Sequence, residues 1–339
     1  MSEQLRKGAA AEEMLRNYFL SLGYYVARGC KFVYHGFDVT DVDLFLYARS
    51  SPLSRERICV DIKNKKTPQA LERIFWVKGV QSILQLDSSI VATTDTRPDV
   101  REFGLRHDVR VLDGTFLSRL NRSAKSHRIR ITEEQFLSEL DSGSLGRLGG
   151  NWCGRYTESK ARLLQSLNFD GCNSWLEELR MLLSEIATGS NPWRLFYALC
   201  SHFLVAIDFI QRDFVGEDQT QRRKVIEQGI RYGSSGKEFA DSVTQMASSL
   251  VESVAGQSGL SRTLQAEIQR QADGIGAEAI ADFFSRQTNG LGPFEVALQF
   301  EEAAFSPEVP PPSTLSPQAK SVIGVVADFC GIDRKLAIP

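Results

Sequence analysis

The sequence predicts two domains: an α/β domain with a mixed sheet over residues 1–120, and an all-α domain over residues 155–305. In the first region helical and strand-like patterns alternate in the order helix, three strands, helix, strand, helix, strand, which contains an αβββαβ core. After residue 155 the patterns are helical and strand signals are absent. The charge changes as well. Up to Arg130 there are 22 Lys and Arg against 15 Asp and Glu, and the remainder has 18 against 27.

The first helix and the strands after it follow from local periodicity. Apolar residues at helical spacing predict a helix from Gly8 to about Leu22, and Gly23 is a typical residue to end it. Runs of β-branched and aromatic residues then predict strands, two short and two longer. In order, these strands are expected over residues 24–28, 31–34, 42–47 and 57–62.

The second half of this domain begins at a proline. Thr67 and Pro68 resemble an N-cap followed by proline at the first helical position, which predicts a helix running to about Leu86. The apolar and polar patterns that follow give further short elements. They are a strand over residues 89–94, a helix over 98–107, a strand over 109–112 and a short helix over 115–120.

The rest of the chain is predicted to be helical. A basic segment and a Gly/Ser-rich linker are expected over residues 121–154, and a proline-rich connection over 306–317 leads to a C-terminal helix within 318–339. The intervening patterns have helical period. The helices are expected over residues 158–168, 174–187, 192–213, 218–230, 236–255 and 260–286.

Composition favours a soluble, cytoplasmic protein. The six cysteines are scattered without Cys-x-x-Cys spacing, which is typical of reduced, buried thiols. The first seven residues lack the apolar run of a signal peptide. The most apolar segment, Trp193–Phe214, contains Arg194 and Asp208 and is expected to be a buried bundle helix, so we expect no membrane contact.

Acidic side chains and a lysine are expected to meet at one end of the sheet. In a strand alternate residues face one side, so Asp61 and Lys63 project together at the end of their strand. Asp43 begins a neighbouring strand, and Glu12 lies on the first helix. Carboxylates beside a lysine suit metal-assisted hydrolysis of a phosphodiester.

These residues carry a family resemblance. Gly8-x-x-x-Glu12, Val42-Asp43-Leu44 and Val60-Asp61-Ile62-Lys63, in this order, resemble the PD-(D/E)XK nuclease superfamily, and in particular Mrr-like restriction endonucleases and archaeal Holliday-junction resolvases. The resemblance covers about residues 1–120 and implies a restriction-endonuclease-like fold there. No proline precedes Asp43, which departs from the family pattern, and Asp41 is a rival for the first aspartate.

The resemblance implies a role for each site residue. Asp43, Asp61 and the carbonyl of Ile62 would bind Mg²⁺ or Mn²⁺, hard cations that prefer oxygen ligands. Glu12 would hold a metal-bound water or a second ion. Lys63 would orient or deprotonate the attacking water, or stabilise the transition state.

A second set of residues has weaker support. Gln81 lies where several relatives carry a site glutamine, although a surface polar residue is the alternative. Six basic side chains could contact DNA phosphates, or could form solvated charge runs. They are Lys65, Lys66, Lys78, Arg122, Lys125 and Arg128.

The sequence therefore predicts a Mg²⁺-dependent DNA endonuclease. By analogy with such domain pairings, we expect it to act in a bacterial restriction or anti-phage defence complex, with the helical domain binding a protein partner or forming a homo-oligomer. One alternative is a non-catalytic protein that grips nucleic acid with a nuclease-like fold. Another is a DNA-repair enzyme that cuts branched junctions, which would need a dimer for symmetric cleavage.

Overall fold

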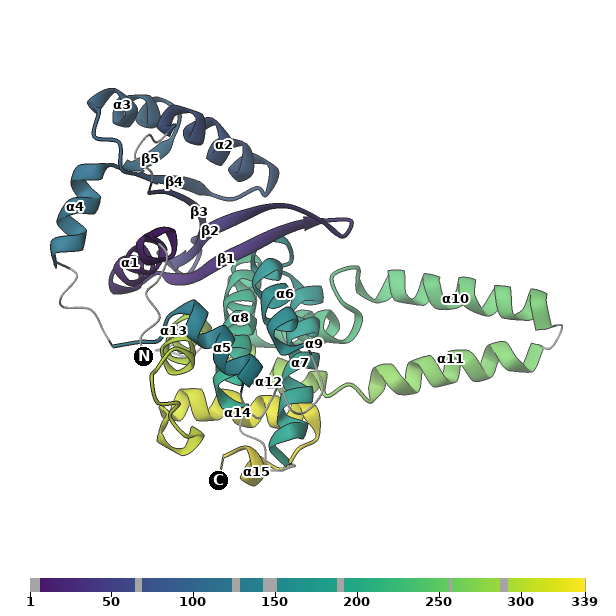
Figure 1. Ribbon diagram of the computed structural model, residues 1–339. Coiled ribbons are helices and arrows are strands. Elements are labelled where there is room, and N and C mark those ends of the chain that lie inside the picture. The colour runs from purple at the N-terminus through teal and green to yellow at the C-terminus, as the bar shows by residue number, and fades with distance from the viewer. Residues whose placement is uncertain are drawn as a thin grey trace. The chain divides into compact units, whose positions relative to one another are not determined.

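A computed structural model gives the architecture of the protein (Figure 1). It describes residues 7–64, 69–123, 129–142, 151–187, 192–255, 258–286 and 292–338. Contacts between residues divide the chain into two compact units. Unit 1 comprises residues 1–165 and 297–309, and unit 2 comprises residues 166–296 and 310–339.

Unit 1 contains a five-stranded mixed sheet, as predicted, in the order β1-β2-β3-β4-β5. The first three strands are antiparallel, and the β3–β4 and β4–β5 pairs are parallel. The two short strands expected first form one continuous strand, in which Gly29 adopts a positive φ of 62° and the pairing with β2 shifts between Phe32 and Val33. The strands are β1 (Tyr25–Tyr34), β2 (Phe37–Arg49), β3 (Arg55–Lys63), β4 (Ser88–Thr93) and β5 (Val109–Leu112).

Helices cover both faces of this sheet (Figure 1). Leu44, Val60 and Ile90 face α1 (Lys7–Ser21) and α4 (Gly114–Ser123) and form one apolar cluster with them. The other face, which includes Cys59, packs against α2 (Ala70–Ile83) and α3 (Pro98–Arg106). Because side chains alternate between the two faces along β2 and β3, adjacent residues of each strand contact different helices.

Unit 1 extends beyond the predicted boundary at residue 120. It also includes α5 (Glu133–Ser142), α6 (Trp152–Gln165) and the end of α13 (Pro293–Ala304). Neither α5 nor α13 was expected as a helix. The Phe136 ring on α5 lies 4.6 Å from the Tyr156 ring and 4.8 Å from the Phe305 ring, so three distant segments share one aromatic contact.

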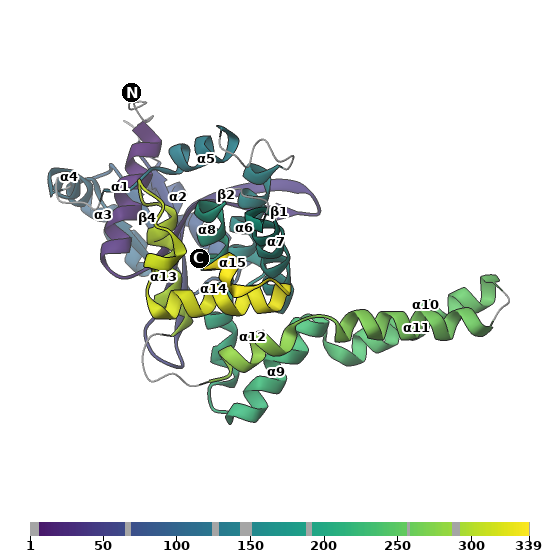
Figure 2. The ribbon, with the colours of Figure 1, turned by 90° about the horizontal axis from the view of Figure 1, so that it is seen from below.

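Unit 2 is all-helical in the residues described, which agrees with the predicted all-α region (Figure 2). The single helix expected over residues 260–286 is two helices, which are separated by residues 274–276. A Cβ at Gly276 would lie 2.8 Å from the Phe329 carbonyl oxygen, so the turn packs closely there. The helices are α7 (Phe169–Ala187), α8 (Trp193–Gln211), α9 (Gln219–Tyr232), α10 (Gly236–Ala255), α11 (Ser258–Asp273), α12 (Ala277–Phe284), α14 (Pro317–Cys330) and α15 (Arg334–Ala337).

Helix α8 is the core of unit 2. Every residue from Trp193 to Ile210 is buried, including Arg194 and Asp208. Among the described residues, Trp193–Phe214 is the one segment long and apolar enough to cross a membrane, and its apolar window is entirely buried. Burial against protein on all sides is typical of a central bundle helix.

Candidate active site

The pairing of β2 with β3 brings the predicted acidic residues together. Leu44 pairs with Val60 in an antiparallel register, so Asp43 and Asp61 are the next residues of their strands in that register. The backbone N–H of Ile62 donates to Asp43 Oδ2 over 2.6 Å, which fixes the side chain of one strand to the backbone of the other. The chain therefore places both aspartates at the same end of the sheet.

Asp61 is buried and held by cations. Arg73 on α2 donates from Nε to Asp61 Oδ2 over 2.8 Å and contacts Oδ1 through its terminal nitrogen, which makes a bidentate pair. Lys63 Nζ lies 3.6 Å from Asp61 Oδ1, and its side chain is partly exposed. Arg73 also stacks on the Trp76 ring, 4.1 Å from its centroid, which supports the guanidinium in this position.

Asp43 has a different electrostatic environment. Burial and, to a smaller extent, the negative charges of Asp61 and Glu12 raise the pKa of its carboxyl to about 6, although the Ile62 N–H and Lys63 oppose the shift. Asp43 and Glu12 therefore lie close enough to interact. At this site carboxylates outweigh the cations that face Asp43, and the ionised form of Asp43 is disfavoured.

Glu12 reaches this region from α1, on the other face of the sheet. Its Oε2 accepts a hydrogen bond of 2.6 Å from Arg28 Nε on β1. Arg28 also binds Glu13 and Glu134, and these carboxylates hold its pKa above the ordinary value against the opposing effect of burial. Glu12 thus links the candidate active site to a set of ion pairs deeper in unit 1.

That set is buried around Arg16, and we call it the Arg16 network. Arg16 is 1% exposed and lies between three carboxylates, with its nitrogens 3.1 Å from Glu133 and 3.0 Å from Glu301. Burial alone would raise the pKa of Glu133, but Lys160, Arg16 and Arg28 lower it to about 2. The members are Glu13, Arg16, Arg28, Arg130, Glu133, Glu134, Lys160 and Glu301.

The remaining predicted residues are placed apart from the aspartates or lie outside the description. Ser89 donates to Gln81 Oε1 over 2.8 Å, and Gln81 donates to the Asp87 carbonyl. The Gln81 side chain is therefore bound near the start of β4, whereas Lys63 pairs with Thr93 at the other end of that strand. Lys78 is partly buried on α2, and Arg122 is exposed on α4. Lys65, Lys66, Lys125 and Arg128 lie outside the described residues.

The donors available to a metal ion are two neighbouring aspartates and the backbone carbonyl of Ile62. One or two carboxylates are the usual protein contribution to Mg²⁺, whose other ligands are water and phosphate oxygens. The raised pKa of Asp43 fits this chemistry, because a bound cation would stabilise the ionised carboxylate that burial disfavours. Within the described ranges, however, no three His, Cys, Asp or Glu side chains are grouped as a metal site, since Glu12 is turned to Arg28.

The sequence pattern did not indicate Arg73 or Arg28. Arg73 lies on the helix that follows the Asp61 strand, and Arg28 pairs with Leu44 on the face toward α1. The helical position of Arg73, about one turn into α2, was a signal that could have shown it near the strand end.

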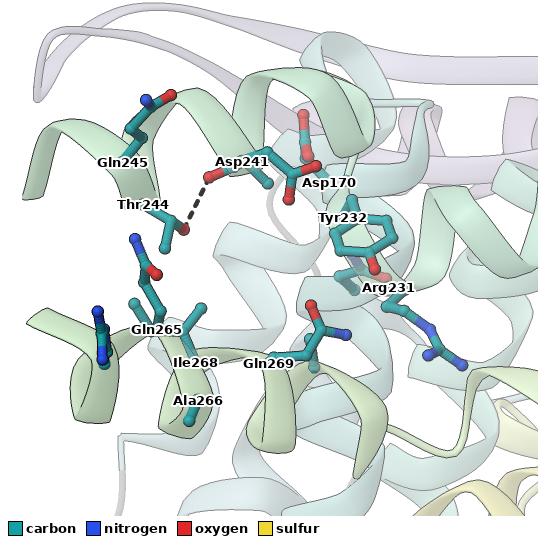
Figure 3. Close-up of a pocket in the computed structure, with 15 residues that line it drawn as sticks. Asp170, Arg231, Tyr232, Asp241, Thr244, Gln245, Gln265, Ala266, Ile268 and Gln269 are labelled. Carbon is teal, nitrogen blue, oxygen red and sulfur yellow. Dashed lines mark hydrogen bonds between the residues drawn. The ribbon is translucent and has the colours of Figure 1, made fainter. Parts of the chain in front are cut away.

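A large cavity lies elsewhere. It has a volume of about 900 Å³ and lies in unit 2 between α9, α10 and α11, with a mostly polar lining that includes Asp241, Thr244 and Gln269 (Figure 3). None of the predicted site residues lines it. Comparisons of this chain with protein-family models, curated proteins and solved structures found no match.

Proposed function

We propose that the protein is a metal-dependent nuclease that hydrolyses DNA phosphodiester bonds. The observation that carries the proposal is the position of Asp43 beside Asp61 and Lys63, in a partly buried environment that raises the pKa of Asp43. Carboxyl groups with a raised pKa are often found at catalytic and metal-binding sites. The mixed sheet with helices on both faces is compatible with the restriction-endonuclease-like fold that the motifs imply.

In this proposal each group has a separate task. Asp43, Asp61 and the Ile62 carbonyl hold Mg²⁺ or Mn²⁺, which supplies neutralisation of charge at the scissile phosphate. Lys63 orients the attacking water or receives its proton, and its partial exposure gives it access to a substrate. Arg73, which pairs with Asp61 in this structure, would also be able to bind a substrate phosphate, since a guanidinium recognises both groups.

The test is cleavage of plasmid DNA by the purified full chain with Mg²⁺ or Mn²⁺. Asp61→Ala and Lys63→Ala should each lower the rate by about a thousandfold or more, because each removes an interaction made in the transition state. Asp43→Ala should match them, while Asp41→Ala, the rival position on the same strand, should retain activity. Equal rates for the wild type and all these variants would reject the proposal.

The substrate is resolved by the same assay with other nucleic acids. Linear, supercoiled and single-stranded DNA, RNA and a four-way junction are compared at one metal concentration. Preference for the junction would favour a repair enzyme, whereas preference for duplex DNA would favour the proposed cytoplasmic restriction or defence role with a partner.

One observation favours a second function, that of a non-catalytic nucleic-acid-binding protein. Both carboxylate oxygens of Asp61 are bound by Arg73, and Glu12 is bound by Arg28. If these pairs are permanent, the same fold binds nucleic acid without cutting it. DNA binding that is insensitive to metal, without cleavage by any preparation, would support this function.

A further inference from the structure

Helix α10 carries a stripe of exposed apolar side chains. Phe239 is 59% exposed, Val243 49%, Met246 68% and Leu250 61%. Their 4-3-4 spacing places all four within a narrow stripe, roughly 60° wide at 100° per residue. Four large apolar side chains along one stripe are an unusual surface for a monomer and typical of a contact site.

The stripe is separate from the contact that α10 makes with α11. The more buried positions of α10 are Ala240, Thr244, Ala247, Ser248 and Val251, and they lie roughly 110° around the helix from the stripe. Figures 1 and 2 both show α10 and α11 side by side as an antiparallel pair. The α10 residues that line the cavity in Figure 3, among them Thr244, also lie off the stripe. The apolar stripe therefore stays exposed when α10 and α11 pack against each other.

The order of the stripe is self-complementary. In an antiparallel pairing about a two-fold axis between residues 244 and 245, Phe239 faces Leu250 of a second copy and Val243 faces Met246 of that copy. A 4-3-4 spacing reads the same in both directions, so every position finds an apolar partner. Alternating three- and four-residue steps are also those of a coiled-coil seam.

The flanks of the stripe fit a second copy better than a lipid surface or a charged partner. One flank carries Ser242, Ser249 and Ser253, and each hydroxyl donates to a carbonyl of its own helix, over 2.8, 3.0 and 2.8 Å. The donors are thus satisfied within the helix, and the flank can be desolvated at low cost. A helix that lies on a membrane would carry Lys or Arg there.

The distribution of charged residues on α10 also favours a second copy of the chain as the partner. Lys237, Asp241 and Glu252 lie on the side of α10 away from the stripe. Glu238 borders the serine flank in the first turn, and the antiparallel register keeps it about 20 Å from Glu238 of a second copy. A two-fold interface brings identical flanks together, so charged flanks would repel one another, and uncharged ones do not. We propose that the α10 stripe is a homodimer interface in which two α10 helices pair antiparallel. This dimer does not depend on the proposed nuclease function.

The mass of the full 37.9 kDa chain in solution tests the interface. Sedimentation equilibrium over a wide concentration range should show a reversible dimer. Met246→Glu and Val243→Lys should each raise the dissociation constant by about 100-fold, because each buries a charge opposite an apolar side chain. Lys237→Glu changes charge on the other side of α10 and should leave the constant unchanged. Circular dichroism should show equal helix content in all variants.

Mixing the two single variants tests the antiparallel register. In that register Lys at position 243 of one chain meets Glu at position 246 of the other, so the mixture should form a heterodimer within about tenfold of the wild-type constant. In a parallel pairing these positions do not meet, and mixing restores nothing. A monomer at every concentration, a dimer unaffected by both substitutions, or no recovery on mixing would each overturn the proposed antiparallel homodimer.

Discussion

Two regions of unit 1 bury carboxylates, and they do so with opposite electrostatic results. In the Arg16 network Glu133 is surrounded by Lys160, Arg16 and Arg28, and its pKa falls to about 2. At the candidate active site burial and the neighbouring anions Asp61 and Glu12 raise the pKa of Asp43 to about 6. The two regions are joined, because Arg28 binds both Glu12 and Glu13.

The two regions differ in how their carboxylates are paired with cations. In the Arg16 network each carboxylate has at least one cation beside it, and the ion pairs link α1, α5, α6 and the end of α13. The site around Asp43 is incomplete, since its anions gain from another positive charge. The first region therefore stabilises unit 1 through paired charges, whereas the second leaves a carboxyl whose ionisation is disfavoured.

The largest predicted effect is loss of the central cation of the network. Arg16→Met should lower the free energy of unfolding by about 3–5 kcal/mol, because Glu13, Glu133 and Glu301 would stay buried without their shared partner. Urea unfolding at neutral pH measures the change. In a double-mutant cycle, adding Glu301→Gln should cost less than the two single effects combined.

The control for this prediction is an exposed pair. Arg106 and Glu102 form an i,i+4 ion pair on α3, and both side chains are well exposed. Arg106→Met should change the unfolding free energy by less than about 0.5 kcal/mol. Equal effects of Arg16→Met and Arg106→Met would mean that the buried network does not hold the unit together.

A smaller effect, of opposite sign, is expected at the candidate active site. The pKa of Asp43 is raised in the folded state, so its ionisation weakens folding as pH rises from its ordinary value of 3.8 through about 6. Asp43→Asn removes that ionisation and should stabilise the protein by about 1–3 kcal/mol at pH 8. The gain should vanish below about pH 4, where the wild-type carboxyl is protonated in both states.

This stability change is followed by urea unfolding at several pH values, alongside the cleavage assay. The same substitution should abolish cleavage, so that stability and activity move in opposite directions. Asp41→Asn is the matched control, because Asp41 is exposed on the same strand. Destabilisation by Asp43→Asn at pH 8 would show that the carboxylate is already compensated within the fold.

Those features of the two regions that depend on local sequence patterns could be predicted from the sequence alone. Periodicity placed the mixed sheet and its flanking helices, and strand alternation put Asp61 and Lys63 on one face. The Arg16 network could not be found in this way, because Arg16 and Glu301 are 285 positions apart and their contact needs α13 to return to unit 1. Helix α5 was missed for a related reason, since its apolar face is made by tertiary contacts of Phe136.

The partners of the acidic residues were also beyond local reasoning. A strand pattern gives the face of Asp61, but it does not say which long side chain from α2 will reach it. Arg73 and Lys78 are both basic residues of that helix, and of these two Arg73 is the one that binds Asp61 in the described residues. The role of Arg28 could not be predicted either, because its partners Glu12 and Glu134 reach it only when α1 and α5 pack beside β1.

The smallest predicted effect concerns Arg73, which gives Asp61 the kind of compensation that Asp43 lacks. If the site binds a divalent cation, Arg73 competes for the carboxylate, so Arg73→Gln should tighten Mn²⁺ binding by about five- to tenfold, on the order of 1 kcal/mol. Isothermal titration calorimetry with Mn²⁺ alone measures this affinity. Arg57→Gln, which disrupts the Arg57–Asp87 pair at the other end of β3, is the control and should leave it unchanged. If Arg73→Gln binds Mn²⁺ more weakly than the wild type does, Arg73 supports the metal site and does not compete with the ion for Asp61. The different environments of Asp43 and Asp61 would then serve the stability of the fold.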